Sequence, residues 1–241
     1  MADLARLGAE EYNRQLFDRT WRMTKLIPPD VWPSWKKYKE LADAAPRRLE
    51  IGPGIHPKLP IEGTHVIDLS DHALDVLGKS GAIVHKGLLH EQKFEDGTFD
   101  LVGIFEVLEH VQDDTGMLKE IHRILKPGGM LALDVPVHMR HFSAFDDLVG
   151  HVRRYETAEL RSKIEAAGFD LVCFEGRYLM MGRFMMWVMA LFIRIFPKFA
   201  LGIVEKNGAK LRKDIWVEWK ETDFESVSDK ASDIAVICRK R

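Results

Sequence analysis

Short apolar segments that alternate with helical segments between residues 47 and 177 constrain the fold of this chain more than any other feature. Five short apolar segments are candidate strands: RLEIG, THVID, AIVHK, FDLVGIF and MLALDVP. The helical segments SDHALDVLGKSG and DDTGMLKEIHRILKPGG each have an acidic start and a glycine stop. A further helix, TAELRSKIEAAGF, leads into the strand FDLVCFEG, and SDIAVICRK is the last strand. Because strands that alternate with helices form a parallel sheet covered on both faces, we predict an α/β domain.

The pattern divides the chain into four predicted parts. Residues 1–45 form an N-terminal helical cap, and residues 46–177 form the core. Residues 178–231 form a helical insertion that is first apolar and then basic, and residues 232–241 form the final core strand. The run FMMWVMALFI in the insertion is shorter than the roughly 20 residues that cross a bilayer, so we expect a buried or interfacial helix.

Composition excludes several classes of protein. With 241 residues, 46% of them apolar, the chain can bury a sizeable core. A formal net charge of -2 weighs against a nucleic-acid partner. The two cysteines, Cys173 and Cys238, are too few for a disulfide framework or a zinc knuckle. Because the charged N-terminus does not resemble a secretory signal, we expect a cytoplasmic protein.

The segment LEIGPG places an acid and two glycines where the first strand ends. Glycines allow a ligand to approach the backbone closely, although a plain strand-end turn has the same appearance. The dinucleotide pattern requires a third glycine, and Pro57 stands there instead, so a nicotinamide or flavin dinucleotide is disfavoured. Glu50 would repel a pyrophosphate but suits a ligand that carries an ammonium group.

Carboxylates also follow two other predicted strands. Asp68 can bind a ribose diol, or Asp68 or Ser70 can cap the next helix. Glu106, Glu109 and His110 follow FDLVGIF, and His110 either faces a substrate or is hydrogen-bonded within the turn. Because this segment lacks a separated set of partner ligands, we predict no metal site.

Together these motifs resemble the class I S-adenosylmethionine-dependent methyltransferases. The resemblance covers residues 47–176 and 233–239 and rests on LEIGPG, VIDLS, FEDGTFDLV, EVLEHVQDD, LKPGGMLALDVP and EAAGF. The segment GHVRRYETAEL is similar to one found in a broad subgroup of these enzymes. The resemblance implies a Rossmann-like fold with a mostly parallel seven-stranded sheet, helices on both faces and an antiparallel last strand.

The resemblance also implies a site for S-adenosylmethionine, with S-adenosylhomocysteine as product. Its residues would be Glu50, Gly52, Pro53, Gly54, Asp68, Leu69, Leu88, Leu89, Phe105, Glu106 and His110. Glu50 would lie near the methionine amino group, and Asp68 would take the ribose hydroxyls. The sequence departs from the family at Leu88, where an acid usually contacts adenine, and at the proline-broken helix after the glycine loop.

Methyl transfer is a direct displacement, and a general base helps where the acceptor is an alcohol or phenol. The pair His138 and His141, just after the fifth strand, are the candidate bases, with His110 and His151 behind them. Each could equally be a surface or capping histidine. The RRY segment at residues 153–155 is either a clamp for an anionic acceptor or a solvated loop, and we favour a role as a structural lid.

The insertion is the natural place for acceptor specificity. Residues 178–213 combine an apolar, methionine-rich half with a basic half, which is typical of a membrane-surface element and also of a core-covering helix with a solvated face. We therefore expect a small, hydrophobic or membrane-associated acceptor and peripheral membrane contact. The alternative is a catalytically silent methyltransferase fold that serves as a scaffold. Methylation of oxygen, nitrogen or carbon, and any oligomeric state, remain open.

Overall fold

The computed structural model describes residues 9–179, 188, 191–192, 195–196, 199, 214–216, 224 and 231–241. Their strands form one sheet in the order β3-β2-β1-β4-β5-β8-β6-β7. The strands are β1 (Arg48–Ile51), β2 (His65–Asp68), β3 (Ile83–Lys86), β4 (Phe99–Phe105), β5 (Leu125–Pro136), β6 (Phe169–Leu179), β7 (Asp214–Trp216) and β8 (Asp233–Lys240). Strands β3, β2, β1, β4 and β5 pair in parallel, and β8 runs antiparallel to both β5 and β6. The seven predicted strands and the antiparallel last strand are confirmed. The short β7, antiparallel to β6, is an eighth strand that the sequence did not predict.

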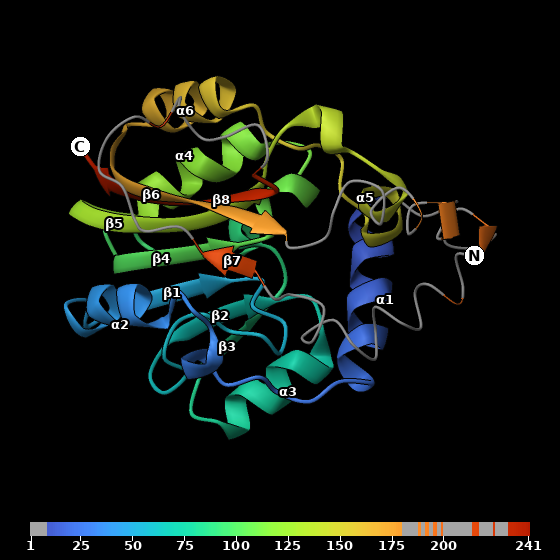
Figure 1. The fold of residues 1–241 in the computed structure, drawn as a ribbon. Coiled ribbons are helices and arrows are strands. Elements are labelled where there is room, and N and C mark those ends of the chain that lie inside the picture. Colours follow the sequence, from blue (N-terminus) through green and yellow to red (C-terminus); the bar gives the residue numbers. More distant parts are fainter. Residues whose placement is uncertain are drawn as a thin grey trace.

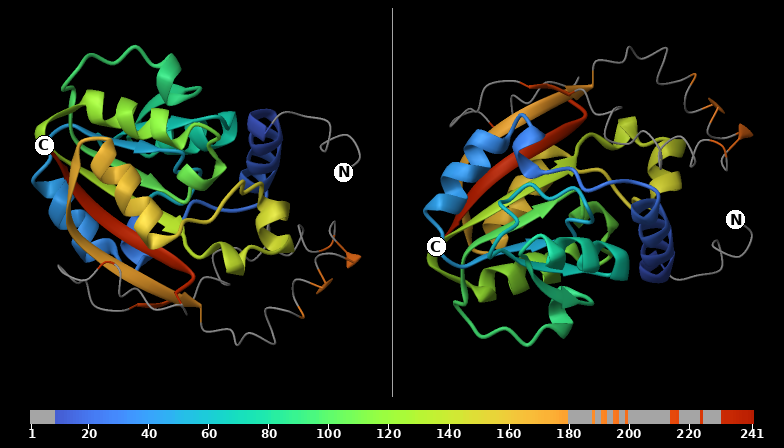
Figure 2. Two further views of the ribbon diagram at one scale, coloured as in Figure 1. Left: turned by 90° about the horizontal axis from the view of Figure 1, so that it is seen from above. Right: turned by 90° about the horizontal axis from the view of Figure 1, so that it is seen from below.

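Helices cover both faces of the sheet, as predicted (Figure 2). Helices α4 (Asp114–Ile124) and α6 (Thr157–Ala166) bury their apolar stripes against one face, in a cluster that includes Leu118, Ile164 and Leu133. Helices α2 (Trp35–Asp43) and α3 (Asp71–Lys79) lie on the opposite face, where Tyr38 packs in the α2 cluster and Val66 in the α3 cluster. This packing fixes the carboxyl ends of β1, β2 and β4 at one edge of the domain.

The first crossover contains no helix, as the prolines predicted. Between β1 and β2 the chain runs through residues 52–64, and the side chains of Ile55 and Leu59 are completely buried. The N-terminal region packs against this crossover, which has no helix of its own. Ile27 donates its backbone N–H to the Ile55 carbonyl at 3.0 Å, and the Trp32 indole N–H donates to the Pro57 carbonyl at 3.1 Å.

The predicted N-terminal cap consists of separate helices on either side of Pro28. Helix α1 (Ala9–Arg22) lies across the edge toward which β1 and β4 point (Figure 1), and η2 (Pro29–Val31) leads into α2. Asp18 of α1 accepts a hydrogen bond from the Ser70 hydroxyl at 2.8 Å, and the Tyr12 hydroxyl donates to the Leu148 carbonyl at 2.9 Å. Leu148 belongs to α5 (Ala144–Val149), a short helix that the sequence did not predict. Helix α1 therefore contacts both the start of α3 (Asp71–Lys79) and α5 at this edge of the sheet.

Most of the predicted insertion, including its basic half, lies outside the described residues. Helical residues Val188, Leu191, Ile195 and Phe199 lie within it, and their exposure ranges from 37% to 65%. Phe192 packs against a small cluster formed by α1 and α5. Among the described residues, no helix combines the length and the apolar character needed to cross a bilayer.

Candidate functional site

Glu50 lies at the carboxyl end of β1 and anchors the segment that replaces the missing helix. Its side chain is almost fully buried and accepts backbone hydrogen bonds from Lys58 at 2.8 Å and from Leu59 at 3.0 Å. Burial raises the pKa of this carboxyl to about 7, although the two hydrogen bonds act in the opposite direction. The sequence indicated a ligand-facing acid, and it gave no sign of this structural role.

Asp68, at the end of β2, links the glycine loop after β1 to the segment that follows β2. One carboxylate oxygen accepts the Gly54 N–H at 2.8 Å, and the other accepts the Ser70 N–H at 2.8 Å. Burial raises the pKa of Asp68 to about 6. The helix cap that Asp68 or Ser70 could have provided belongs to Ser70, whose hydroxyl accepts the Ala73 N–H at 3.2 Å. Asp68 therefore does not cap the helix, and its carboxylate points toward the glycine loop.

The glycine loop is tightly covered. Gly52 and Gly54 have φ values of +63° and +56°, a conformation that favours glycine. A Cβ on Gly52 would lie 2.7 Å from Val107, and a Cβ on Gly54 would overlap the Trp21 indole. Trp21 of α1 also stacks on Phe17, with ring centroids 5.7 Å apart. The N-terminal helix therefore closes over the loop, and the sequence did not reveal this contact.

The loop after β3 carries an acid, but not where the family usually has one. Leu88 donates its backbone N–H to the Glu91 carboxylate at 2.7 Å, and the Leu88 carbonyl accepts the Glu91 N–H at 3.1 Å. Both residues border η3 (Leu89–Glu91), in which Leu89 is buried. Glu91 thus lies three residues after the position where the resemblance implies an acid. The backbone N–H and the carbonyl of Leu88 both have hydrogen-bond partners within this turn.

The other predicted cofactor residues differ in their surroundings. Pro53 is buried and Leu69 is half-buried beside the two carboxylates. Phe105 packs on Tyr38, with ring centroids 4.8 Å apart, in the core cluster beneath α2. Glu106 directly follows β4 with φ +56°, an uncommon backbone conformation for a residue other than glycine.

His110 lies on η4 (Leu108–His110), at the carboxyl end of β4. Its Nδ1 donates to the Gly150 carbonyl at 3.0 Å, and its ring contacts Phe17 of α1 and His151 edge-on, with centroids 5.4 and 4.7 Å apart. Burial, reinforced by His151, lowers the pKa of His110 to about 3. The imidazole is therefore neutral at physiological pH.

The candidate bases, His138 and His141, lie next to each other. His138 directly precedes η5 (Met139–His141) and His141 ends it, with ring centroids 5.5 Å apart. His138 is buried, has φ +64°, and places Nδ1 3.4 Å from the Glu156 carboxylate. A strained histidine held by an acid is an arrangement suited to proton transfer.

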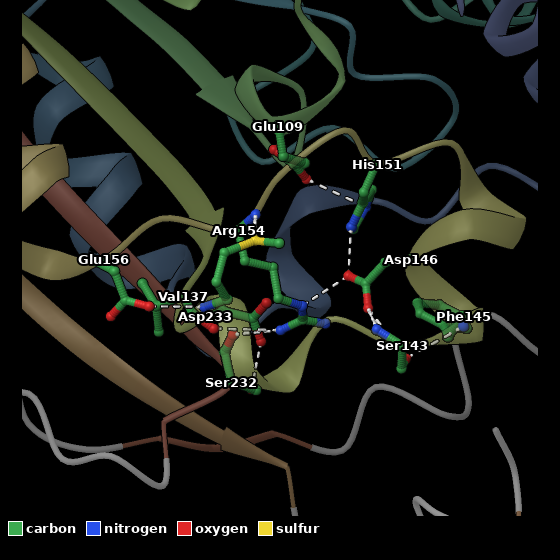
Figure 3. A network of polar contacts seen from close by, with 11 residues as sticks. Glu109, Val137, Ser143, Phe145, Asp146, His151, Arg154, Glu156, Ser232 and Asp233 are labelled. Carbon is green, nitrogen blue, oxygen red and sulfur yellow. Dashed lines mark hydrogen bonds and ion pairs between the residues drawn. The ribbon is translucent and has the colours of Figure 1, made fainter.

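The RRY segment has a structural role among the described residues. Arg153 forms an ion pair with Asp114, and the buried Tyr155 hydroxyl donates to the same carboxylate at 2.9 Å. Arg154 forms a buried ion pair with Asp146 at 2.7 Å (Figure 3). These contacts join the loop to α4 and α5, which favours the lid interpretation over an anion clamp.

Comparison with known proteins now identifies the domain. Residues 52–133 match the model of a family described as methyltransferase domain. These residues belong to a methyltransferase domain, and the sheet has the fold of the class I S-adenosylmethionine-dependent methyltransferases. A solved S-adenosylmethionine-dependent methyltransferase from Thermotoga maritima shares the fold, with a TM-score of 0.60 at 17% identity over 95% of this chain and 100% of that one.

Two curated relatives match part of the chain. A protein of Mycolicibacterium smegmatis named probable S-adenosylmethionine-dependent methyltransferase is 31% identical over 90 residues, which is 36% of this chain and 35% of the relative. The demethylmenaquinone methyltransferase of Bacillus cytotoxicus is 30% identical over 118 residues, or 46% of this chain and 48% of the relative. The chain thus spans less than half of either relative, and S-adenosylmethionine is the cofactor of the family.

The described residues fit this cofactor. Glu50 and Asp68 are buried carboxylates, and burial raises the pKa of each although backbone hydrogen bonds act in the opposite direction. A ligand with an ammonium group near Glu50 and a diol near Asp68 would supply a cation and hydrogen-bond donors to these buried groups. Each carboxylate accepts two backbone hydrogen bonds, and its oxygens have about four acceptor sites in all, so acceptor capacity remains.

Proposed function

We propose that this chain transfers a methyl group from S-adenosylmethionine to a small, hydrophobic or membrane-associated acceptor. The observation that carries the proposal is the pair of buried carboxylates, Glu50 and Asp68, that bracket a glycine loop within the matched domain. In this proposal Glu50 orients the methionine ammonium and Asp68 the ribose diol. The cofactor supplies an electrophilic methyl group on a positively charged leaving group, and the chain aligns the acceptor with it.

His138 and His141 are the proposed bases for an acceptor that carries a proton. Either imidazole would accept the proton of an alcohol or phenol through a ring nitrogen, and Glu156 would stabilise the resulting charge on His138. The pair lies just after β5, at the same sheet edge as Glu50 and Asp68. Replacing both by glutamine should lower kcat while leaving S-adenosylhomocysteine affinity unchanged.

The apolar acceptor is supported by the exposed side chains of the insertion. Leu191, Ile195 and Phe199 are apolar helical residues, and all three are more than 40% exposed. An exposed apolar surface of this kind is typical of membrane or lipid contact. The relative from Bacillus cytotoxicus is named for demethylmenaquinone, which is consistent with such an acceptor.

Calorimetry with S-adenosylhomocysteine tests the cofactor part of the proposal. We expect binding to the wild-type chain and its loss in Asp68→Ala. An absence of binding at millimolar ligand would instead favour the scaffold interpretation, which the cover of Trp21 over Gly54 also suggests. Wild-type affinity in a correctly folded Asp68→Ala variant would contradict the assigned role of this carboxylate.

Liposome cosedimentation tests the membrane part. The triple variant Leu191→Ser, Ile195→Ser and Phe199→Ser should lose vesicle binding. Ile83→Ser provides a matched control, because Ile83 is 45% exposed on the edge strand β3, away from the insertion. Equal vesicle binding by the triple variant and the wild type would refute membrane contact through this surface.

A further inference from the structure

Two histidines and a glutamate converge at the carboxyl end of β4. Glu109 and His110 come from η4, and His151 comes from the loop after α5, about 40 positions later in the chain. One potential ligand atom from each of the three side chains lies within 4.8 Å of the other two. A backbone hydrogen bond of 3.0 Å from Val152 to Glu109 ties the two segments together. The sequence showed Glu109 and His110 but not their separated partner.

In both His110 and His151, Nδ1 faces an oxygen acceptor, so Nε2 is the nitrogen that can bind a metal. A carbonyl oxygen can only accept, so the Gly150 carbonyl fixes the proton of His110 on Nδ1. His151 places its Nδ1 2.9 Å from the Asp146 carboxylate, which likewise fixes the proton there. In the neutral ring, Nε2 then carries a lone pair. Metal-binding histidines are oriented in this way by a carbonyl or carboxylate behind them.

The distance between His151 and Glu109 distinguishes a metal site from a simple hydrogen-bonded pair. The Nε2 atom of His151 lies 3.6 Å from a carboxylate oxygen of Glu109 (Figure 3), which is too long for a hydrogen bond. Two ligands that each lie about 2.0–2.1 Å from a tetrahedral metal are about 3.4 Å apart. The observed gap is therefore close to that between two ligands of one ion.

The outer partner of His151 is itself held in place. Asp146 is completely buried, and its second oxygen accepts hydrogen bonds from the Ser143 backbone and hydroxyl at 2.8 and 3.1 Å. Arg154 approaches the oxygen that faces His151, with its Nε 2.7 Å away, and balances the charge of Asp146. A fixed carboxylate behind a ligand histidine restricts the ring to one orientation, which favours a preformed site.

We propose that Glu109, His110 and His151 bind a divalent transition-metal ion of the Zn²⁺ type. Two imidazoles and one carboxylate suit such an ion better than Mg²⁺, which prefers oxygen ligands. Three protein ligands leave a coordination position open, as in catalytic rather than structural sites. The open position suits an oxygen of the methyl acceptor; this last step rests on the proposed function, whereas metal binding itself does not.

Metal binding is tested on the full chain without cofactor. After treatment with a chelator, Zn²⁺ titrated by calorimetry should bind once per chain. The variants Glu109→Gln, His110→Gln and His151→Gln should each weaken binding at least about 100-fold, and Asp146→Asn, which affects only the outer partner, about 10–100-fold. His90→Ala, an exposed histidine of η3, should bind as the wild type does.

The visible spectrum of the Co²⁺-loaded wild-type chain gives a readout that needs no variant. Intense bands of a four- or five-coordinate ion would support the site, and the weak bands of the hydrated ion would overturn it. Failure of the folded wild type to bind Zn²⁺, or equal binding by the three folded ligand variants, would also overturn it. Binding of S-adenosylhomocysteine, measured separately, shows whether the proposed function fails independently of the metal site.

Discussion

Glu50 should make the stability of this protein depend on pH, and Glu50→Gln should remove that dependence. Burial raises the pKa of Glu50 in the folded protein to about 7, against an ordinary value of 4.5. The folded state therefore favours the protonated carboxyl relative to the unfolded state. The stability contributed by this group is fully present below pH 4.5 and is lost as the pH rises through about 7.

The expected size follows from the gap between 4.5 and about 7. One pKa unit corresponds to about 1.36 kcal/mol, so the loss reaches about 1 kcal/mol by pH 5 and about 3 kcal/mol by pH 8. The wild type should therefore lose about 2–3 kcal/mol from this group between these pH values. Glutamine does not titrate, so the variant should lack this component while Asp68 and Glu175 titrate in both proteins.

Urea unfolding of both proteins at pH 5 and pH 8 measures this difference directly. A constant cost of the substitution cancels, because only the change with pH is compared. Glu62→Gln, an exposed residue of the same crossover, should follow the wild type. Equal losses in the wild type and Glu50→Gln between pH 5 and pH 8 would refute the assigned environment of Glu50.

Two further substitutions probe the core and the glycine loop. Arg177→Met removes the ion-pair partner of Asp134, which lies 2.5 Å from Arg177 in a fully buried pair. The substitution should lower the free energy of unfolding, measured in urea, by about 3–5 kcal/mol. A loss below about 1 kcal/mol would contradict this role of the ion pair. Adding Asp134→Asn should recover part of the loss. Gly54→Ala should lower Tm because its methyl group would overlap Trp21 at a φ of +56°, and Trp21→Ala should reduce this penalty. An unchanged Tm in Gly54→Ala would show that α1 does not rest on the loop.

The parts of the fold that the sequence predicted are those with a local signal. The strand around Val66 and the helix after Ser70 each follow from a period, a cap or a stop within about a dozen residues. The missing first helix was also evident, because Pro57 and Pro60 interrupt it. Strand β7 has three residues and α5 has six, which is too short for a period to be recognised.

The candidate site was predicted only where its residues follow strands directly. Glu50 and Asp68 were found because parallel strands bring their carboxyl ends to one edge. Their hydrogen bonds to the Lys58 and Gly54 backbones depend on how the loops return, and the sequence has no pattern that specifies this. The contact of Trp21 with Gly54 joins positions more than 30 residues apart for the same reason.

The RRY segment shows how tertiary contacts decide between alternatives that the sequence left open. Arg154 could have served as an anion clamp, but its guanidinium is buried against Asp146. Asp146 in turn orients His151, so one ion pair fixes both the loop and the histidine that completes the cluster with Glu109. The same arginine therefore helps to position His151 as well as the loop, and only the folded structure reveals that link.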